Sequence, residues 1–208
     1  MPRRAPIDPH GWYHVGSRGS YGRPLYADVL EHEVFLRMYG RVSTKYRWET
    51  PAWALMKNHY HFVVHLDDGG LSEGMRELNG GFSRWRNEIY GLTGAGHLVR
   101  HGFFARPLAD DADVIGTCAY VDLNPIAHRT SFAARRSDWS GLLATLGRVH
   151  PRAFHRPEAL LELLDERPGG ARRKYRQILL DEHVRRGQVA SPNDVFEVIP
   201  PSVIQSAA

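Results

Sequence analysis

The stretch TPAWALMKNHYHFVVHL, residues 50–66, contains two strand-like segments that follow each other almost directly. Only Lys57 and Asn58 separate TPAWALM from HYHFVVHL, a spacing typical of a tight β-hairpin. Asn58 suits such a turn because asparagine tolerates positive φ. The centre of the chain is therefore predicted to be an antiparallel pair of strands.

A helix is predicted on each side of this hairpin. Before it, Asp28 and Glu31 form a D-x-x-E capping box, and apolar residues then recur near helical spacing over residues 29–46. After it, six apolar side chains repeat with 4-3-4-3-4 spacing over residues 71–89. The hairpin thus connects two amphipathic helices.

Two further extended segments and a last helix complete the pattern. Residues 12–15 are strand-like, and residues 97–108, HLVRHGFFARPL, form another extended segment. Asp110 or Asp111 is expected to cap a helix through DADVIGTCAYVDLN, which Pro125 is expected to stop. The order strand, helix, strand, strand, helix, strand, helix predicts an α+β fold. It is the ferredoxin-like split βαβ antiparallel sheet with helices on one face, plus one added helix.

The pattern changes towards the C-terminus. Residues 1–146 are predicted to form the main domain, residues 147–188 a helical extension, and residues 189–208 an irregular tail. Within the extension, PEALLELLDER and GARRKYRQILLDEHVRR are predicted to be two helices separated by the Pro-Gly-Gly of residues 168–170.

Composition limits the classes of protein to consider. The net charge is +4 and the basic residues are 24 Arg and 3 Lys, which favours an anionic polymer as partner, although a base-composition bias of the genome explains the Arg:Lys ratio as well. The single cysteine, Cys118, forms no internal disulfide. No apolar run approaches the roughly 20 residues of a spanning helix, and no secretory leader is evident. We expect a soluble, cytoplasmic protein without a membrane partner.

Two pairs of residues are candidates for chemistry. In a strand, His59 and His61 share one face while Tyr60 takes the other, so the two histidines either hold one metal ion together or are ordinary exposed or hydrogen-bonded side chains. Tyr120 and Asn124 lie one turn apart on a polar stripe of the last predicted helix. The simpler interpretation of this pair is a tyrosine at the rim of the core and a helix stop.

Six segments of the chain occur in a characteristic order and spacing. They are YHVGSRG (13–19), GRPLY (22–26), ALMKNHYHFVVHL (54–66), GHLVRHGFF (96–104), YVDLNPI (120–126) and DWSGLLA (138–144). Together they resemble the single-tyrosine HUH transposases, over about residues 11–146. The resemblance is greatest to the REP-associated tyrosine transposases, which carry an IS200-like transposase domain. In the HUH motif a bulky hydrophobic residue separates two histidines, and Tyr60 takes that middle place.

The resemblance implies a metal-dependent transesterase. His59, His61 and Asn124 would hold a divalent ion, Mg²⁺ or Mn²⁺, and Tyr120 would attack single-stranded DNA to give a 5′-phosphotyrosine. The expected DNA carries hairpin or REP-type palindromic elements, and the protein would be a nucleoid-associated monomer or homodimer. The alternative is a domesticated, catalytically dormant protein that binds hairpin DNA in a structural or regulatory role. A metal hydrolase has little support because no carboxylate accompanies the histidine pair.

DNA contacts are assigned to basic and aromatic residues near these segments. The candidates for phosphate are Arg18, Arg23, Arg84 and Arg86, and Tyr26 or Tyr21 is the candidate for stacking on an unpaired base. The chain departs from the family pattern at Lys57, at Gly102 and in the IAHRT of residues 126–130. These departures bear on DNA preference and leave the four site residues in place.

Overall fold

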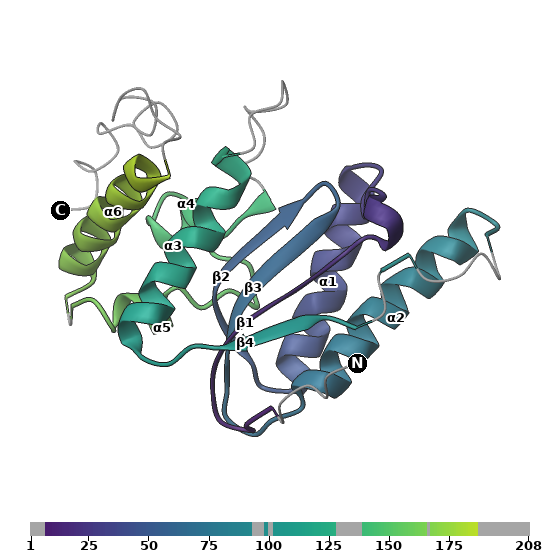
Figure 1. Cartoon of the computed structure of the whole chain (residues 1–208), viewed down its shortest axis with the longest axis horizontal. Helices are drawn as coiled ribbons and strands as arrows, with labels where there is room; N and C mark the ends of the chain where they lie inside the picture. Colours follow the sequence, from purple (N-terminus) through teal and green to yellow (C-terminus); the bar gives the residue numbers. More distant parts are fainter. Residues whose placement is uncertain (1–6, 93–97, 100–101, 128–138, 166, 187–208) are drawn as a thin grey trace.

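A four-stranded antiparallel sheet forms the centre of the molecule (Figure 1). The computed structural model describes residues 7–92, 98–99, 102–127, 139–165 and 167–186. The strand order is β2-β3-β1-β4, and the element order up to α3 is the predicted one. The ferredoxin-like sheet is therefore confirmed. The strands are β1 (Gly11–Arg18), β2 (Glu49–Met56), β3 (His59–Leu66) and β4 (Phe104–Pro107).

Helices α1 (Val29–Lys45) and α2 (Leu71–Ile89) cover one face of the sheet (Figure 1). The predicted N-cap is confirmed, because the Glu31 backbone N–H donates to Asp28 Oδ1 at 2.9 Å at the start of α1. The Glu31 side chain accepts from the Ala27 backbone N–H, one residue before the position that a reciprocal capping box would use. Aromatic side chains dominate the buried layer between the helices and the sheet. Tyr39 of α1, for example, stacks on Phe62 of β3 with ring centroids 3.7 Å apart.

The opposite face of the sheet carries α3 (Asp111–Ala127). Three apolar side chains of this helix, Val114, Cys118 and Val121, are buried in a second core cluster. That cluster includes Ala54 of β2 and Val63 of β3, whose side chains leave the sheet on the face away from α1 and α2. The added helix therefore lies over the face that carries His59 and His61.

The C-terminal part packs on the same body through α3 and α1. It contains α4 (Leu142–Thr145), α5 (Glu158–Leu161) and α6 (Pro168–Arg185). The Tyr175 hydroxyl of α6 donates to Asp122 Oδ2 of α3 at 2.8 Å, and Phe154 is buried in the aromatic core beside α1. A short 3-10 turn, η1 (Ser20–Gly22), follows β1 near the N-terminus.

Several boundaries differ from those predicted from sequence. Pro125 does not stop α3, which continues to Ala127, because a proline near the last turn removes only one backbone hydrogen bond. Pro168 and the two glycines after it form the first turn of α6, where proline has no hydrogen-bonding N–H to lose. The tight turn between β2 and β3 forms without the positive φ that Asn58 could adopt, since Tyr21 and Arg47 are the described non-glycine residues with that conformation.

Other predictions fall partly outside the described residues. Among the described residues of the extended segment 97–108 are the four-residue strand β4 and Val99, which forms an isolated bridge with Gly19. His97, His101, the end of the IAHRT segment and the tail 189–208 lie outside the part of the chain that the structure describes. Among the helices of the described ranges, none is both long and apolar enough to cross a bilayer.

Candidate active site

Three histidines meet on the face of the sheet below α3. His59 and His61 of β3 have ring centroids 5.0 Å apart, and His14 of β1 lies 5.0 Å from His61. His59 Nδ1 is 2.8 Å from Asn58 Oδ1, and His61 Nδ1 is 3.0 Å from His14 Nε2. Each member of the His-x-His pair therefore uses Nδ1 for a hydrogen bond.

A glycine in β1 makes the contact between His14 and His61 possible. Gly16 is the residue directly opposite His61 in the β1–β3 register, so the diagonal neighbour His14 can reach across to His61. A Cβ at Gly16 would lie 2.3 Å from the Tyr60 carbonyl oxygen and 2.7 Å from a ring carbon of Phe104. Phe104 of β4 occupies this space and meets His14 edge-on, with centroids 4.9 Å apart.

Tyr120 of α3 lies directly over this cluster. Its ring centroid is 5.9 Å from that of His14 and 5.9 Å from that of His61, and its side chain is 39% exposed. Asn124, one turn further along α3, is buried, and its amide nitrogen has no hydrogen-bond partner among the described residues. The structure thus brings Tyr120 to His61, and leaves a buried amide on the same helix with hydrogen-bonding capacity to spare.

Burial favours the neutral form of two histidines of this cluster. The pKa of His61 is lowered to about 3, first by burial and then by repulsion between its protonated form and the charges of His14, His59 and Arg18 when those groups are protonated. Burial, followed by the Arg106 charge, lowers the pKa of His14 to about 4. A neutral imidazole is the form that donates a lone pair to a metal ion, so His61 is in the ligating form at neutral pH.

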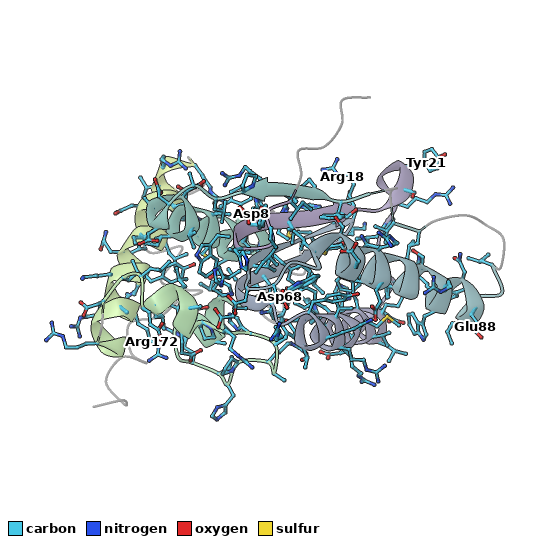
Figure 2. The ribbon with its side chains drawn as sticks, turned by 90° about the horizontal axis from the view of Figure 1, so that it is seen from below. Asp8, Arg18, Tyr21, Asp68, Glu88 and Arg172 are labelled. Carbon is cyan, nitrogen blue, oxygen red and sulfur yellow. The ribbon has the colours of Figure 1, made fainter. Side chains whose placement is uncertain are left out.

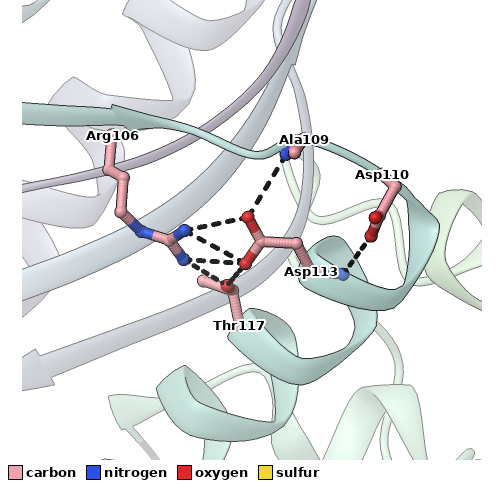
Figure 3. A network of polar contacts seen from close by, with 5 residues as sticks. All are labelled: Arg106, Ala109, Asp110, Asp113 and Thr117. Carbon is pink, nitrogen blue, oxygen red and sulfur yellow. Dashed lines mark hydrogen bonds and ion pairs between the residues drawn. The ribbon is translucent and has the colours of Figure 1, made fainter.

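A polar network fixes α3 to the sheet beside these rings (Figure 3). Arg106 of β4 donates to both carboxylate oxygens of Asp113, at 3.0 and 2.9 Å, and to Thr117 Oγ1 at 2.8 Å. Asp113 lies in the first turn of α3, where its backbone N–H donates to Asp110 Oδ1. Hydrogen bonds from Arg106 hold the pKa of the Asp113 carboxyl below its usual range. These hydrogen bonds from the Arg106 guanidinium hold one face of α3 against β4, and so help to orient Tyr120 of the same helix towards the histidines.

Both histidines of β3 use the same ring nitrogen for a hydrogen bond. With Nδ1 of His59 and of His61 hydrogen-bonded, Nε2 is the ring atom that each would offer to a metal ion, and metal-binding histidines typically hydrogen-bond through their other ring nitrogen. Within the described ranges, no group of three or more His, Cys, Asp or Glu residues could hold a metal ion. Asn124, on the helix over these rings, is the sequence-predicted source of a further oxygen ligand.

The residues assigned to DNA contact differ in their exposure to solvent. Arg18 ends β1 opposite His59, is exposed, and is close enough to lower the His61 pKa. Tyr21 is 97% exposed with a φ of 56°, and it lies at the surface near Arg18 (Figure 2). Arg23 is exposed just beyond η1. Tyr26 is buried among core aromatic rings and cannot stack on a base, which makes it a wrong assignment.

Arg84 and Arg86 lie on α2, in the helix layer of the opposite face. Arg84 is exposed. Arg86 donates from Nε to Glu31 Oε1 at 2.9 Å, and the Glu31 side chain is only 1% exposed. The guanidinium of Arg86 therefore neutralises a buried carboxylate, while its assignment to DNA phosphate stays a prediction.

Sequence reasoning missed His14 and Arg106. Both lie on strands that were predicted, and both point to the histidine face, since His14 is opposite Arg106 in the β1–β4 register. Alternation along residues 12–15 would have placed His14 on one face of its strand. The strand order and register that bring it to His61 cannot be derived from that alternation.

Comparison with known proteins assigns the chain to a family. A family model described as transposase IS200 like matches residues 10–124, more than half of the chain. The structure of a REP-associated tyrosine transposase bound to a REP hairpin is similar, with a TM-score of 0.55 and 19% identity over 75% of this chain and 90% of that one. A candidate transposase from Deinococcus radiodurans gives a TM-score of 0.41 and 13% identity, over 54% and 89%. Curated protein sequences gave no match. Since the family match covers the sheet, both histidines of β3 and α3 as far as Asn124, the chain belongs to the IS200-like transposase family.

Proposed function

We propose that this transposase-family protein cleaves and rejoins single-stranded DNA through a covalent bond to Tyr120. The observation that carries the proposal is the position of Tyr120, a half-exposed phenol whose ring lies 5.9 Å from that of the neutral His61. A nucleophile beside a pair of metal-ligating side chains, on a helix fixed by Arg106, is an arrangement suited to phosphoryl transfer.

The reaction is an exchange of phosphoesters. The Tyr120 oxygen bonds to phosphorus, the bond from phosphorus to the 3′-oxygen breaks, and the 5′-phosphate remains on the tyrosine. The phenolic proton passes to water, and the departing 3′-oxygen takes up a proton to become a hydroxyl. A 3′-hydroxyl that attacks a phosphotyrosine reverses these steps and joins two strands. No external energy is needed because the number of phosphoester bonds is unchanged.

His59, His61 and Asn124 are the residues that would hold a Mg²⁺ or Mn²⁺ ion. The two histidines use Nδ1 for hydrogen bonds to Asn58 and His14, which orients both rings for ligation through Nε2. A bound divalent ion supplies Lewis-acid polarisation of the scissile phosphate. Imidazole ligands favour Mn²⁺ over Mg²⁺ in intrinsic affinity.

The DNA is proposed to be a single strand with a hairpin next to the cleaved bond. Support comes from the structural relative, which was solved bound to a REP hairpin. Arg18, exposed beside His59, is suited to a backbone phosphate, and Tyr21 presents an almost fully exposed ring on which an unpaired base can stack. The oligomeric state, monomer or homodimer, stays a prediction.

A covalent-adduct assay tests this function. The probe is a labelled single-stranded DNA library with a randomised imperfect hairpin and randomised flanks, incubated with the full chain and Mn²⁺. We expect a protein–DNA adduct that survives a denaturing gel, whose recovered DNA defines the substrate. Tyr120→Phe should abolish the adduct because it removes only the attacking oxygen. His61→Ala should reduce it by at least about 100-fold, as for loss of an essential transition-state group.

Each outcome has a definite meaning. Adduct formation that persists in Tyr120→Phe would show that another residue is the nucleophile. Cleavage without any adduct would indicate hydrolysis by water. DNA binding with neither cleavage nor adduct, in the presence of Mn²⁺ or Mg²⁺, would identify a dormant binding protein and contradict the proposal.

A further inference from the structure

Arg186, the residue at the C-terminal cap of α6, places a positive charge against Tyr120. The Arg186 guanidinium lies over the Tyr120 ring, with its central carbon 4.6 Å from the ring centroid. The Arg186 side chain is only 13% exposed. The residue lies more than sixty positions beyond the end of the family match at residue 124, so the contact is supplied by the C-terminal part of this chain.

Packing and hydrogen bonds hold Arg186 in this position. Helix α6 is anchored on α3 by the buried hydrogen bond from Tyr175 to Asp122 and by the buried side chain of Leu179. Arg186 Nε donates to Glu182 Oε1 at 2.8 Å, one turn earlier on α6. With one edge of the guanidinium held by Glu182 and one face on the Tyr120 ring, the group is ordered before any substrate arrives.

The guanidinium nevertheless has unused hydrogen-bonding capacity. Nη2 of Arg186 is buried and has no partner among the described residues. A buried N–H without an acceptor is costly, and more so when it carries charge. The ligands that best match a guanidinium are carboxylate and phosphate oxygens. The neighbouring Arg185 binds the same Glu182, but its side chain is exposed and is not one of those with a buried, unpartnered nitrogen.

We propose that Arg186 binds a non-bridging oxygen of the scissile phosphate while Tyr120 attacks it. This inference rests on the proposed function and adds a catalytic residue to it. Negative charge builds on those oxygens as the bond from the Tyr120 oxygen to phosphorus forms and the bond to the 3′-oxygen breaks. Arg186 keeps all its protons and acts as a fixed positive charge, the kind of group that stabilises a phosphoryl-transfer transition state. The C-terminal part of the chain thereby completes the active site.

Single-turnover adduct formation, measured with the DNA recovered from the library, tests this role. Arg186→Gln should form the Tyr120 adduct about 10- to 100-fold more slowly than the wild type, since it loses a charged donor at the phosphate. Arg186→Lys should react at an intermediate rate, because lysine keeps the positive charge but lacks the planar guanidinium with its paired N–H donors. Arg185→Gln is the matched control, from the same turn and with the same Glu182 partner, and should react within about twofold of the wild type.

Binding separates the transition-state role from simple DNA attraction. In a Tyr120→Phe background, which keeps the ring under Arg186, adding Arg186→Gln should raise the Kd for the same DNA by no more than about threefold, as for one screened phosphate contact. A loss of affinity as large as the loss of rate would show that Arg186 acts in ground-state binding and would overturn the proposal.

Other results would overturn it as well. An Arg186→Gln rate equal to that of the wild type would show that the contact is only structural. A faster rate would show that Arg186 shields Tyr120. If Arg186→Gln melts below the assay temperature, Arg186→Lys decides: an intermediate rate supports the proposal, and a rate equal to that of the wild type overturns it. If the wild-type chain forms no adduct at all, the proposed function itself is refuted. If the wild type forms the adduct and only the comparison of Arg186 variants fails, the role of Arg186 is refuted and the proposed function stands.

Discussion

At the scale of single residues, the packing of the site depends on Gly16, which has no side chain. Gly16 faces His61 across the β1–β3 pair, and Phe104 fills the space where a Cβ would stand. The Tyr60 carbonyl oxygen is also within 2.3 Å of that Cβ position, and a backbone oxygen cannot rotate away as a flexible side chain can. A methyl group would have to separate β1 from β3 or move Phe104 off His14.

We therefore expect Gly16→Ala to destabilise the protein by about 1–3 kcal/mol, the usual cost of overpacking. Denaturant unfolding measures the change. Gly116→Ala is the matched control, because Gly116 lies within α3 with nothing near its Cβ position, and alanine there should be neutral or stabilise by up to about 1 kcal/mol. Equal stability of Gly16→Ala and the wild type would mean that the close packing at β1 is not present in solution.

The same residues show what the sequence could and could not predict about the site. Alternation along a strand placed His59 and His61 on one face, and helical spacing placed Tyr120 and Asn124 on one stripe, because these relations are local. The pairing of His14 with His61 depends on strand register, and that of Arg186 with Tyr120 depends on how α6 docks. Such contacts between distant segments follow from packing, and no periodicity in the sequence encodes them.

At the scale of elements, a largely buried ion pair joins the two helices of the aromatic face, in addition to the exposed pair of Lys45 with Glu77. Glu31 in the first turn of α1 is buried and accepts hydrogen bonds from the Ala27 backbone N–H at 2.7 Å and from Arg86 of α2 at 2.9 Å. The Arg86 side chain is 21% exposed, so the pair is mostly shielded from solvent. Removing one partner of such a pair leaves a buried charge without compensation.

Arg86→Gln is expected to destabilise the fold by about 1–3 kcal/mol, below the range for fully buried pairs because Arg86 is partly solvated. Arg84→Gln, two residues earlier and exposed, should change the free energy of unfolding by less than about 0.5 kcal/mol. The double variant Glu31→Gln/Arg86→Gln should be more stable than the sum of its single changes predicts, since neither partner is left alone. Thermal unfolding of the four proteins measures this coupling, and strict additivity would exclude it.

The capping, periodicity and hairpin signals predicted helices α1 and α2 and strands β2 and β3 correctly, whereas prolines gave poor predictions of where helices begin and end. The capping box at Asp28 and the apolar repeat over residues 71–89 both gave helices at the expected places. Pro125 and Pro168 were given the wrong effect because a proline disrupts a helix according to its position within it. At the first turn it loses nothing, and near the last turn the packing of α3 on the sheet outweighs one missing hydrogen bond.

At the scale of the whole molecule, a buried carboxyl connects the sheet body to the C-terminal part. Asp122 of α3 is fully buried, accepts one hydrogen bond from the Tyr175 hydroxyl of α6, and has its other oxygen without a partner among the described residues. Burial raises the pKa of Asp122 to about 8, and the Tyr175 hydrogen bond opposes that rise. The carboxyl is therefore expected to be largely protonated in the folded protein at neutral pH.

This protonation makes global stability depend on pH in a definite direction. In the unfolded chain the Asp122 pKa returns to about 3.9, so between about pH 4 and pH 8 the folded state binds the extra proton. The contribution of Asp122 to the free energy of unfolding is then greatest below pH 4, falls by up to about 1.4 kcal/mol per pH unit, and levels off above pH 8.

Asp122→Asn cannot ionise but can still accept from Tyr175, so its stability relative to the wild type should increase steadily between about pH 4 and pH 8. Chemical denaturation at several pH values measures the difference, with the exposed Asp181→Asn of α6 as a control for the loss of one charge. Parallel stability curves for Asp122→Asn and the wild type would show that Asp122 is ionised in the folded protein, and that α6 is held on α3 by a charged hydrogen bond.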